Sequence, residues 1–406
     1  MKFFKSLPAK LIIGLLIGMV VGLLCSTFEA QLPAVTGAVM TVLVTAKYIM
    51  GQLITFCVPL IIIGFIAPSI TKLGSSASRM LTVALILAYV SSILAAFMSM
   101  GAGYGLIPFL PIASEVDGLK ELPAVAFELN IPQIMPVMSA LVFSVLVGLA
   151  AVWSKATTVI RLLDEILRIV LNIVSKIVIP VLPFFIGTTF AGLAYDGTIT
   201  KQLPVFVLVI LIVMVGHYVW MGVLYGAAGI YSKTNPIEVV KHYGPAYITA
   251  VGTMSSAATL SVALTCAHKS KTLRRDMVDF GIPLFANIHL CGSVLTEVFF
   301  VMVVSKILYG TLPSVGSMIL FCLLLGVFAI GAPGVPGGTV MASLGLIISV
   351  LGFDEVGTGL MLTIFALQDS FGTACNVTGD GALTLMLTGY ANKHNIKEES
   401  IVSVEL

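Results

Sequence analysis

Charged side chains are scarce in this sequence. Asp, Glu, Lys and Arg together make up 10% of its 406 residues, whereas soluble domains carry roughly 25%. Hydrophobic residues make up 58%, and the mean hydropathy is +1.10. So little charge with so much apolar surface predicts a polytopic membrane protein.

Two other features are missing. The formal net charge is only +2, and no basic patch is interleaved with aromatic residues, so a nucleic-acid partner is not indicated. The six cysteines form no CxxC pair and no Cys/His metal spacing, so neither a disulfide framework nor a zinc site is suggested. No nucleophile–base pair occurs in a water-accessible setting, and we expect a protein that is not an enzyme.

Long apolar segments fill the first part of the chain. Several exceed the roughly 20 residues that cross a bilayer upright, which predicts helices that are tilted or broken in the membrane. The first segment follows three lysines but has no A-x-A cleavage site, so we interpret it as a helix and not as a signal peptide. The segments lie near residues 8–28, 34–70, 78–110, 134–154, 157–194 and 203–231.

Basic residues recur at alternate ends of these segments, and the connection 114–130 is acidic. If the segments alternate simply across the membrane, the basic ends lie on one side and the acidic connection lies on the other. The positive-inside rule then places both termini in the cytoplasm. We expect a multi-pass protein of the plasma membrane, or of the inner membrane if the source is bacterial.

Two interrupted apolar segments mark the second half. The motif GTMSSAAT, residues 252–259, lies between two basic clusters, which predicts a hairpin that enters and leaves on the same side. The motif GAPGVPGGT, residues 331–339, lies in an uncharged segment, and its glycines and prolines predict a second hairpin from the opposite side. Paired interruptions in inverted positions indicate the binding site of a transporter, and a channel explains them less well.

A polar face interrupts the last apolar segment. Asp369, Thr373, Asn376 and Asp380 are spaced i, i+4, i+7 and i+11, which places them on one face of a helix. Polar and charged groups facing lipid are costly, so this face should look into protein or a water-filled cavity. We interpret it as a functional site, and a purely structural polar seam is the alternative.

The sequence resembles the dicarboxylate/amino acid:cation symporter family along essentially its whole length. The resemblance implies an all-α polytopic membrane protein with eight transmembrane helices, two re-entrant hairpins and inverted repeats. It also implies a homotrimer in the lipid bilayer and an elevator mechanism with the second hairpin as gate. Four motifs carry it: 253-TMSSAATLS-261, 283-PLFANIHLCGS-293, 332-APGVPGG-338 and 369-DSFGTACNVTGD-380.

The resemblance also implies a division of the chain. Scaffold helices are expected over 1–75 and 111–200. Transport-domain elements are expected over 76–110 and 201–395, with hairpins at about 236–268 and 314–352 inside the latter range. Residues 396–406 are expected to form a cytoplasmic tail.

The same resemblance assigns residues to an amino-acid substrate. Asp369 matches the acid that receives the substrate ammonium, and the hydroxyls and amides of the first hairpin tip suit its carboxylate. Ser293 aligns with a threonine that faces the substrate side chain. The implied substrate-binding residues are Ser255, Ser256, Ser293, Val335, Gly337, Asp369, Gly372, Thr373 and Asn376.

Gly372 decides the expected substrate class. It stands where members with acidic substrates carry an arginine that binds the side-chain carboxylate. Glycine offers no charge there, so a buried acidic side chain would lack a partner. Together with the fragment LQDS, residues 367–370, this favours serine, threonine or alanine. Transport of dicarboxylates or other organic anions, and a substrate-independent anion channel, are the alternatives.

The ion sites depart from the family. Its Asn-Met-Asp-Gly-Thr motif reads His289, Leu290, Cys291, Gly292 and Ser293 here, and a cysteine is a poor ligand for a hard cation. Sodium is nevertheless the expected coupling ion. The candidate ligands implied by the resemblance are Asn287, His289, Asn376 and Asp380.

Two titratable residues leave proton coupling open, alone or beside sodium. His289 is of the type that changes charge near neutral pH. Glu297 aligns with a position where proton-coupled members carry glutamate, and a buried glutamate can gain and lose a proton during a cycle. The alternatives are a core histidine with satisfied hydrogen bonds and a carboxylate paired within its own domain.

Overall fold

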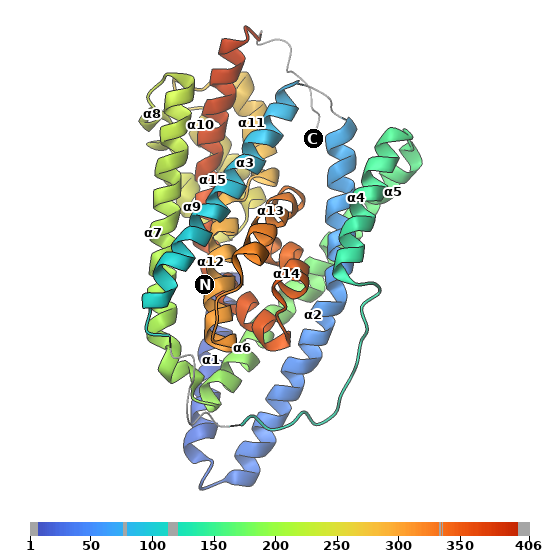
Figure 1. Ribbon diagram of the computed structural model, residues 1–406, viewed down its shortest axis with the longest axis vertical. Coiled ribbons are helices and arrows are strands. Elements are labelled where there is room, and N and C mark those ends of the chain that lie inside the picture. The colour runs from blue at the N-terminus through green and yellow to red at the C-terminus, as the bar shows by residue number, and fades with distance from the viewer. Residues whose placement is uncertain (1–6, 76–78, 113–120, 333, 335, 397–406) are drawn as a thin grey trace.

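The computed structural model describes residues 7–75, 79–112, 121–332, 334 and 336–396, and the regular elements in these ranges are all helical (Figure 1). The first half contains α1 (Leu7–Phe28), α2 (Pro33–Ser75), α3 (Arg79–Leu106) with the short η2 (Ile107–Phe109), α4 (Val137–Trp153), α5 (Thr157–Ile173), the π-turn η3 (Val174–Val178), α6 (Ile179–Tyr195) and α7 (Thr198–Ser232). The second half contains α8 (Ile237–Val240), α9 (Gly244–Thr253), α10 (Ser256–Ala267), α11 (Arg275–Ile288), α12 (Cys291–Tyr309), α13 (Val315–Gly331), α14 (Gly338–Leu351) and α15 (Glu355–Lys393).

The predicted apolar segments all coincide with helices. Within the described residues, 5 stretches are long and apolar enough to cross a membrane: Pro33–Pro68, Arg79–Phe109, Thr157–Tyr195, Val205–Ser232 and Arg275–Tyr309. A helix satisfies its own backbone hydrogen bonds, which the bilayer interior requires because it offers no water. The structure therefore agrees with a multi-pass membrane protein.

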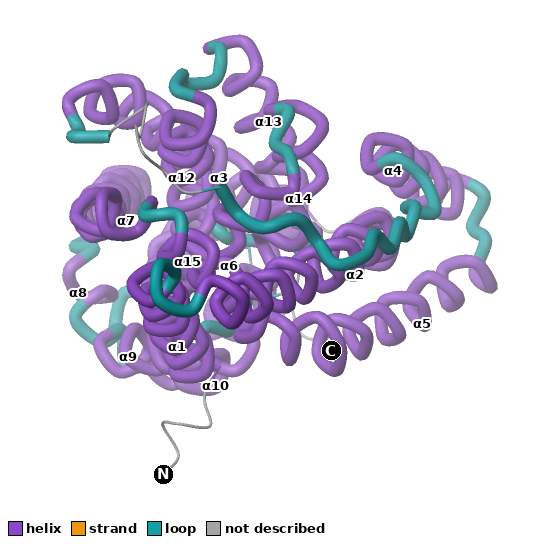
Figure 2. Tube along the Cα trace, turned by 90° about the horizontal axis from the view of Figure 1, so that it is seen from below, coloured by secondary structure: helices purple, strands orange, loops and turns teal. Residues whose placement is uncertain are grey.

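In the first half, α1 packs along α6 through glycine. A Cβ atom on Gly18 would lie 1.9 Å from the carbonyl oxygen of Gly187, and Gly14 and Gly22 make similar approaches to α6. Small residues permit such close backbone contact between helices in a membrane. Seen from below, α4 and α5 lie at one edge of the molecule, and α7, α8 and α9 lie at the opposite edge (Figure 2).

The second half is built around α12 and α15. Helix α15 packs against α7, α9, α11 and α12, and every residue of α12 from Cys291 to Ser305 is buried. The two helices run antiparallel, because Gly292 contacts Cys375 while Tyr309 binds Asp354 at the far end of the pair. The polar face of α15 therefore points into protein, as predicted.

Two helical hairpins occur where the sequence predicted them. The first, α9–α10, turns at Met254 and Ser255, and the second, α13–α14, turns between Gly331 and Gly338. The turns meet, since the hydroxyl of Ser255 donates to the carbonyl oxygen of Gly334 at 2.6 Å. That each hairpin enters and leaves the membrane on one side stays a prediction.

The segment between the two hairpins is divided. The structure breaks it between α11 and α12 at His289 and Leu290. His289 is extended there, with φ −117° and ψ 103°. The break exposes the first amides of α12, and these amides bind a side chain from α15 as described below.

Candidate functional site

A small polar cavity lies where the two hairpin turns meet α12 and α15. The free space enclosed there is only about 10 Å³, which is room for about one water molecule. Five of the predicted substrate residues line it, and the lining comprises Met254, Ser256, Leu290, Ser293, Gly334, Thr339, Asp369, Thr373 and Asn376. Thr339, in the first turn of α14, was not among the predicted residues, because nothing in its sequence context distinguishes it.

Asp369 is the one acidic residue in that lining, and it is buried. Its Oδ2 atom accepts a hydrogen bond of 2.7 Å from the backbone amide of Gly337, and its Oδ1 atom lies 3.5 Å from the hydroxyl of Thr373. None of the lining residues given above is basic. The carboxylate is thus positioned to receive a cationic group that enters the cavity.

The two serines of the first hairpin take different places. The hydroxyl of Ser255 caps α10 by accepting from the amide of Ala258 at 3.2 Å, and it joins the two hairpin turns through Gly334. Ser256 instead lines the cavity. Of the second hairpin, Gly337 contacts Asp369, and Val335 lies outside the described residues.

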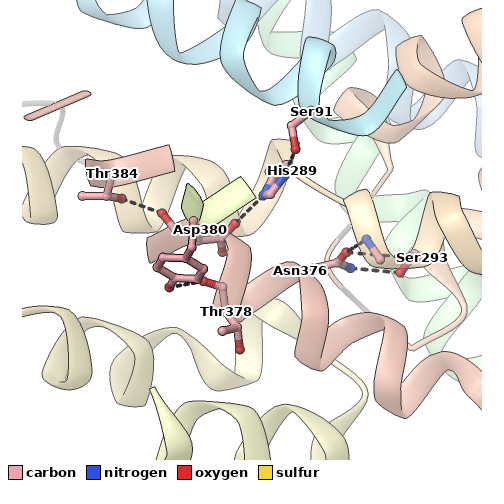
Figure 3. A network of polar contacts seen from close by, with 9 residues as sticks. Ser91, His289, Ser293, Asn376, Thr378, Asp380 and Thr384 are labelled. Atoms are coloured by element: carbon pink, nitrogen blue, oxygen red, sulfur yellow. Dashed lines mark hydrogen bonds and ion pairs between the residues drawn. The ribbon is translucent and has the colours of Figure 1, made fainter. Parts of the chain in front are cut away.

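Asn376 joins the cavity to the break before α12. Its Oδ1 atom accepts from the amides of Gly292 and Ser293 at 2.7 and 3.2 Å, and its amide nitrogen donates to the hydroxyl of Ser293 at 2.9 Å (Figure 3). These bonds satisfy amides that have no partner within α12. A predicted substrate residue thus also fixes the start of a helix.

Gly372 does not line the cavity. It lies at the closest approach of α12 and α15, where a Cβ atom on it would sit 3.3 Å from the Cα atom of Ser293. A Cβ atom on Gly292 would lie 2.5 Å from the carbonyl oxygen of Gly372. The absent side chain therefore leaves room for a neighbouring helix, and the cavity gains no space from it.

Two of the candidate sodium ligands, His289 and Asp380, contact each other, whereas Asn287 and Asn376 bond to other groups. Asn287 is exposed, and its side-chain nitrogen donates to the carbonyl oxygen of Pro283 at 2.8 Å. His289 and Asp380 are buried and contact each other at 2.9 Å, and His289 also contacts Ser91 (Figure 3). In the described ranges, no three His, Cys, Asp or Glu side chains form a group that could hold a metal ion.

Glu297 lies one turn along α12 from Ser293. It is fully buried and accepts a short hydrogen bond from the hydroxyl of Ser343, while its Oε2 atom has no hydrogen-bond partner among the described residues. The side chain of Gln368 is also buried and likewise lacks a described partner at both amide atoms. Gln368 was not among the residues predicted from the sequence, because the charge that marks a functional residue there is on its neighbour Asp369.

Proteins of known families have sequences similar to this chain. The sequence model of the sodium:dicarboxylate symporter family matches residues 7–389. Excitatory amino acid transporter 2 of Mus musculus is 25% identical over 254 residues, covering 61% of this chain and 43% of that protein. An excitatory amino acid transporter of Caenorhabditis elegans is 30% identical over 149 residues, covering 37% of this chain and 29% of that protein. Each match thus spans less than half of the relative's length.

Proposed function

Because the chain belongs to the sodium:dicarboxylate symporter family, we propose that it is a secondary active symporter for a small neutral amino acid such as serine, threonine or alanine. Proteins of this family are transporters with sodium coupling, and they are not enzymes. We further propose that the protein works as a homotrimer in the plasma membrane, or in the inner membrane of a bacterium, and that a sodium gradient, a proton gradient or both drive it.

One observation carries the proposal: a buried acid faces a cavity otherwise lined by hydroxyl, amide and apolar groups. An α-amino acid places an ammonium beside a carboxylate, and Asp369 suits the ammonium. The hydroxyl of Ser256 and the groups around Asn376 suit the carboxylate as hydrogen-bond donors. A dicarboxylate would bring two negative charges toward Asp369, which like-charge repulsion in a buried site opposes.

The lining also supports a neutral substrate side chain. An acidic side chain would need a basic partner, because a buried unpaired charge is costly, and no lining residue is basic. Ser293 and Thr339 offer hydroxyl groups that could bind the hydroxyl of serine or threonine.

The contacts of the second hairpin support its proposed role as gate. Its turn is held over the cavity by Gly337, which binds Asp369, and by Gly334, which binds Ser255. A substrate ammonium that binds Asp369 would compete with the amide of Gly337. In the proposed cycle, the domain formed by the hairpins, α12 and α15 carries the closed cavity across the membrane.

Uptake into proteoliposomes tests the proposal. We expect labelled L-serine to accumulate only with an inward sodium or proton gradient, and unlabelled threonine and alanine to compete with it. Uptake at the same rate without any gradient would rule out a symporter. Ionic current without substrate and without accumulation would indicate a channel instead.

The family description favours one second candidate, a carrier of dicarboxylates or other organic anions. The same assay separates it from the first. If succinate or glutamate in large excess abolishes serine uptake and is itself accumulated, the second candidate is correct. If neither competes, the neutral amino acid assignment stands.

A further inference from the structure

Asp380 is a buried acid on the last long helix, α15. Its side chain is 1% exposed, and it lies on α15 one helical turn beyond Asn376. A carboxylate at such a place requires a partner of opposite charge or strong hydrogen-bond donors. In a sodium-coupled family, the obvious partner is a bound sodium ion.

The structure supplies a different partner. His289 is 0% exposed, and its Nδ1 atom lies 2.9 Å from Oδ1 of Asp380. Its Nε2 atom lies 2.9 Å from the hydroxyl oxygen of Ser91 on α3. An ionised carboxylate can only accept, so Nδ1 donates to it, and the other nitrogen of a neutral ring accepts from Ser91. Both nitrogens are therefore engaged, and the ring bridges three segments of the fold.

The imidazole ring also fills the available space. A Cβ atom on Gly379 would lie only 3.0 Å from Cε1 of His289 and 3.4 Å from the sulfur of Cys291. The ring of Phe285 packs edge-on against the imidazole, with ring centroids 6.3 Å apart. A hard cation needs several oxygen ligands at short range, whereas these packing contacts of the ring are with Gly379, the sulfur of Cys291 and an aromatic ring.

Oxygen atoms of neighbouring residues on α15 already accept hydrogen bonds. Oδ1 of Asn376 accepts from two amides of α12. The backbone carbonyl of Thr378 accepts from the hydroxyl of Tyr225 at 2.7 Å, and that of Asp380 accepts from the hydroxyl of Thr384 at 2.8 Å (Figure 3). A sodium ion at Oδ1 of Asp380 would have to displace the histidine ring, and it would share the other oxygen atoms with their present hydrogen-bond donors.

We propose that His289 takes the place of a sodium ion beside Asp380, so that the protein itself supplies the carboxylate's partner and no sodium ion binds there. A coupling sodium ion then uses other ligands. This inference rests on the proposed function in one respect, namely that a cation is transported together with the substrate. It does not depend on which substrate is transported.

Thermal unfolding of the purified protein without amino acid tests it. The protein is compared in sodium chloride and choline chloride at constant ionic strength, because a ligand that binds the folded state raises Tm with its concentration. We expect Asp380→Asn to respond to sodium as the wild type does, whatever the absolute Tm. If the wild type is stabilised by sodium and Asp380→Asn is not, the proposal is overturned.

His289→Asn provides the second measurement, and it is informative even if Asp380→Asn does not fold. The shorter side chain frees Asp380 and adds an amide oxygen, so we expect a new sodium response of roughly 2 °C in Tm for each tenfold rise in sodium. The double variant His289→Asn/Asp380→Asn should lose this response. If His289→Asn responds to sodium no more than the wild type does, the histidine does not exclude the ion.

His217→Asn is the matched control. His217 is also buried, but its Nε2 atom contacts the carbonyl oxygen of Gly292 and the hydroxyl of Thr296, and among the described residues no carboxylate bonds to it. The same substitution there should gain no sodium response. Because no amino acid is present, failure of this test is distinct from failure of the serine uptake assay.

Discussion

Asp369→Asn tests the assignment of the substrate ammonium most directly. Asn keeps the size of the side chain and an oxygen atom that can still accept from Gly337, so the hairpin contact at 2.7 Å can survive. The charge, however, is lost. The substrate ammonium would then be buried without its counter-charge.

The size of the effect follows from the burial. Removing one partner of a buried ion pair costs about 3 to 5 kcal/mol, which corresponds to a loss of affinity of roughly 100- to 5,000-fold. We expect L-serine to raise the Tm of the wild type and to leave that of Asp369→Asn unchanged at the same concentration. Unchanged serine affinity in the variant would refute the ammonium assignment.

Asp354→Asn is a control on the same helix. Its carboxylate caps α15 by accepting from the amide of Gly357 at 2.8 Å, and it lies outside the cavity lining. Asn is about as good a cap as Asp, so the variant should fold with little loss of stability. Serine binding should stay as in the wild type, and a parallel loss in both variants would indicate a general effect on α15.

Three further predictions concern stability and selectivity. Gly292→Ala places a methyl group 2.5 Å from Gly372 and should destabilise the protein by about 1 to 3 kcal/mol in thermal unfolding, whereas Gly222→Ala, with open space around it, should not lower Tm. Gly372→Arg should abolish serine uptake without creating glutamate uptake, because the added side chain meets α12. Ser255→Ala removes the cap of α10 and its bond to Gly334, and should lower stability by about 0.5 to 2 kcal/mol.

The hairpins were predictable because their signals are local. Glycine and proline between residues 331 and 338 cannot continue a helix, and the basic clusters around the first hairpin limit how the chain can cross. The polar face of α15 was also readable, since the spacing from Asp369 to Asp380 is a property of one helix. Such features depend on neighbouring residues, which the sequence displays directly.

The break before α12 was not predictable, because its cause lies far away in the chain. No glycine or proline stands at His289 or Leu290, and the amides of α12 are satisfied by Asn376 from α15. Similarly, the sequence shows that Gly372 lacks the arginine side chain found in family members with acidic substrates. Only the packing shows that Gly372 faces Ser293 and not the cavity. Tertiary contacts of this kind leave no periodic pattern.

The double use of Asn376 has a consequence for how the cavity and the His289–Asp380 contact influence each other. One face of its amide borders the cavity, and its oxygen holds the segment that carries His289 toward Asp380. A ligand that draws this amide toward itself must weaken its hold on α12 and disturb that histidine. Occupancy of the cavity and the placement of His289 beside Asp380 are thereby linked thermodynamically, and the linkage is reciprocal. The side-chain amide of Asn376 is the element that connects the two.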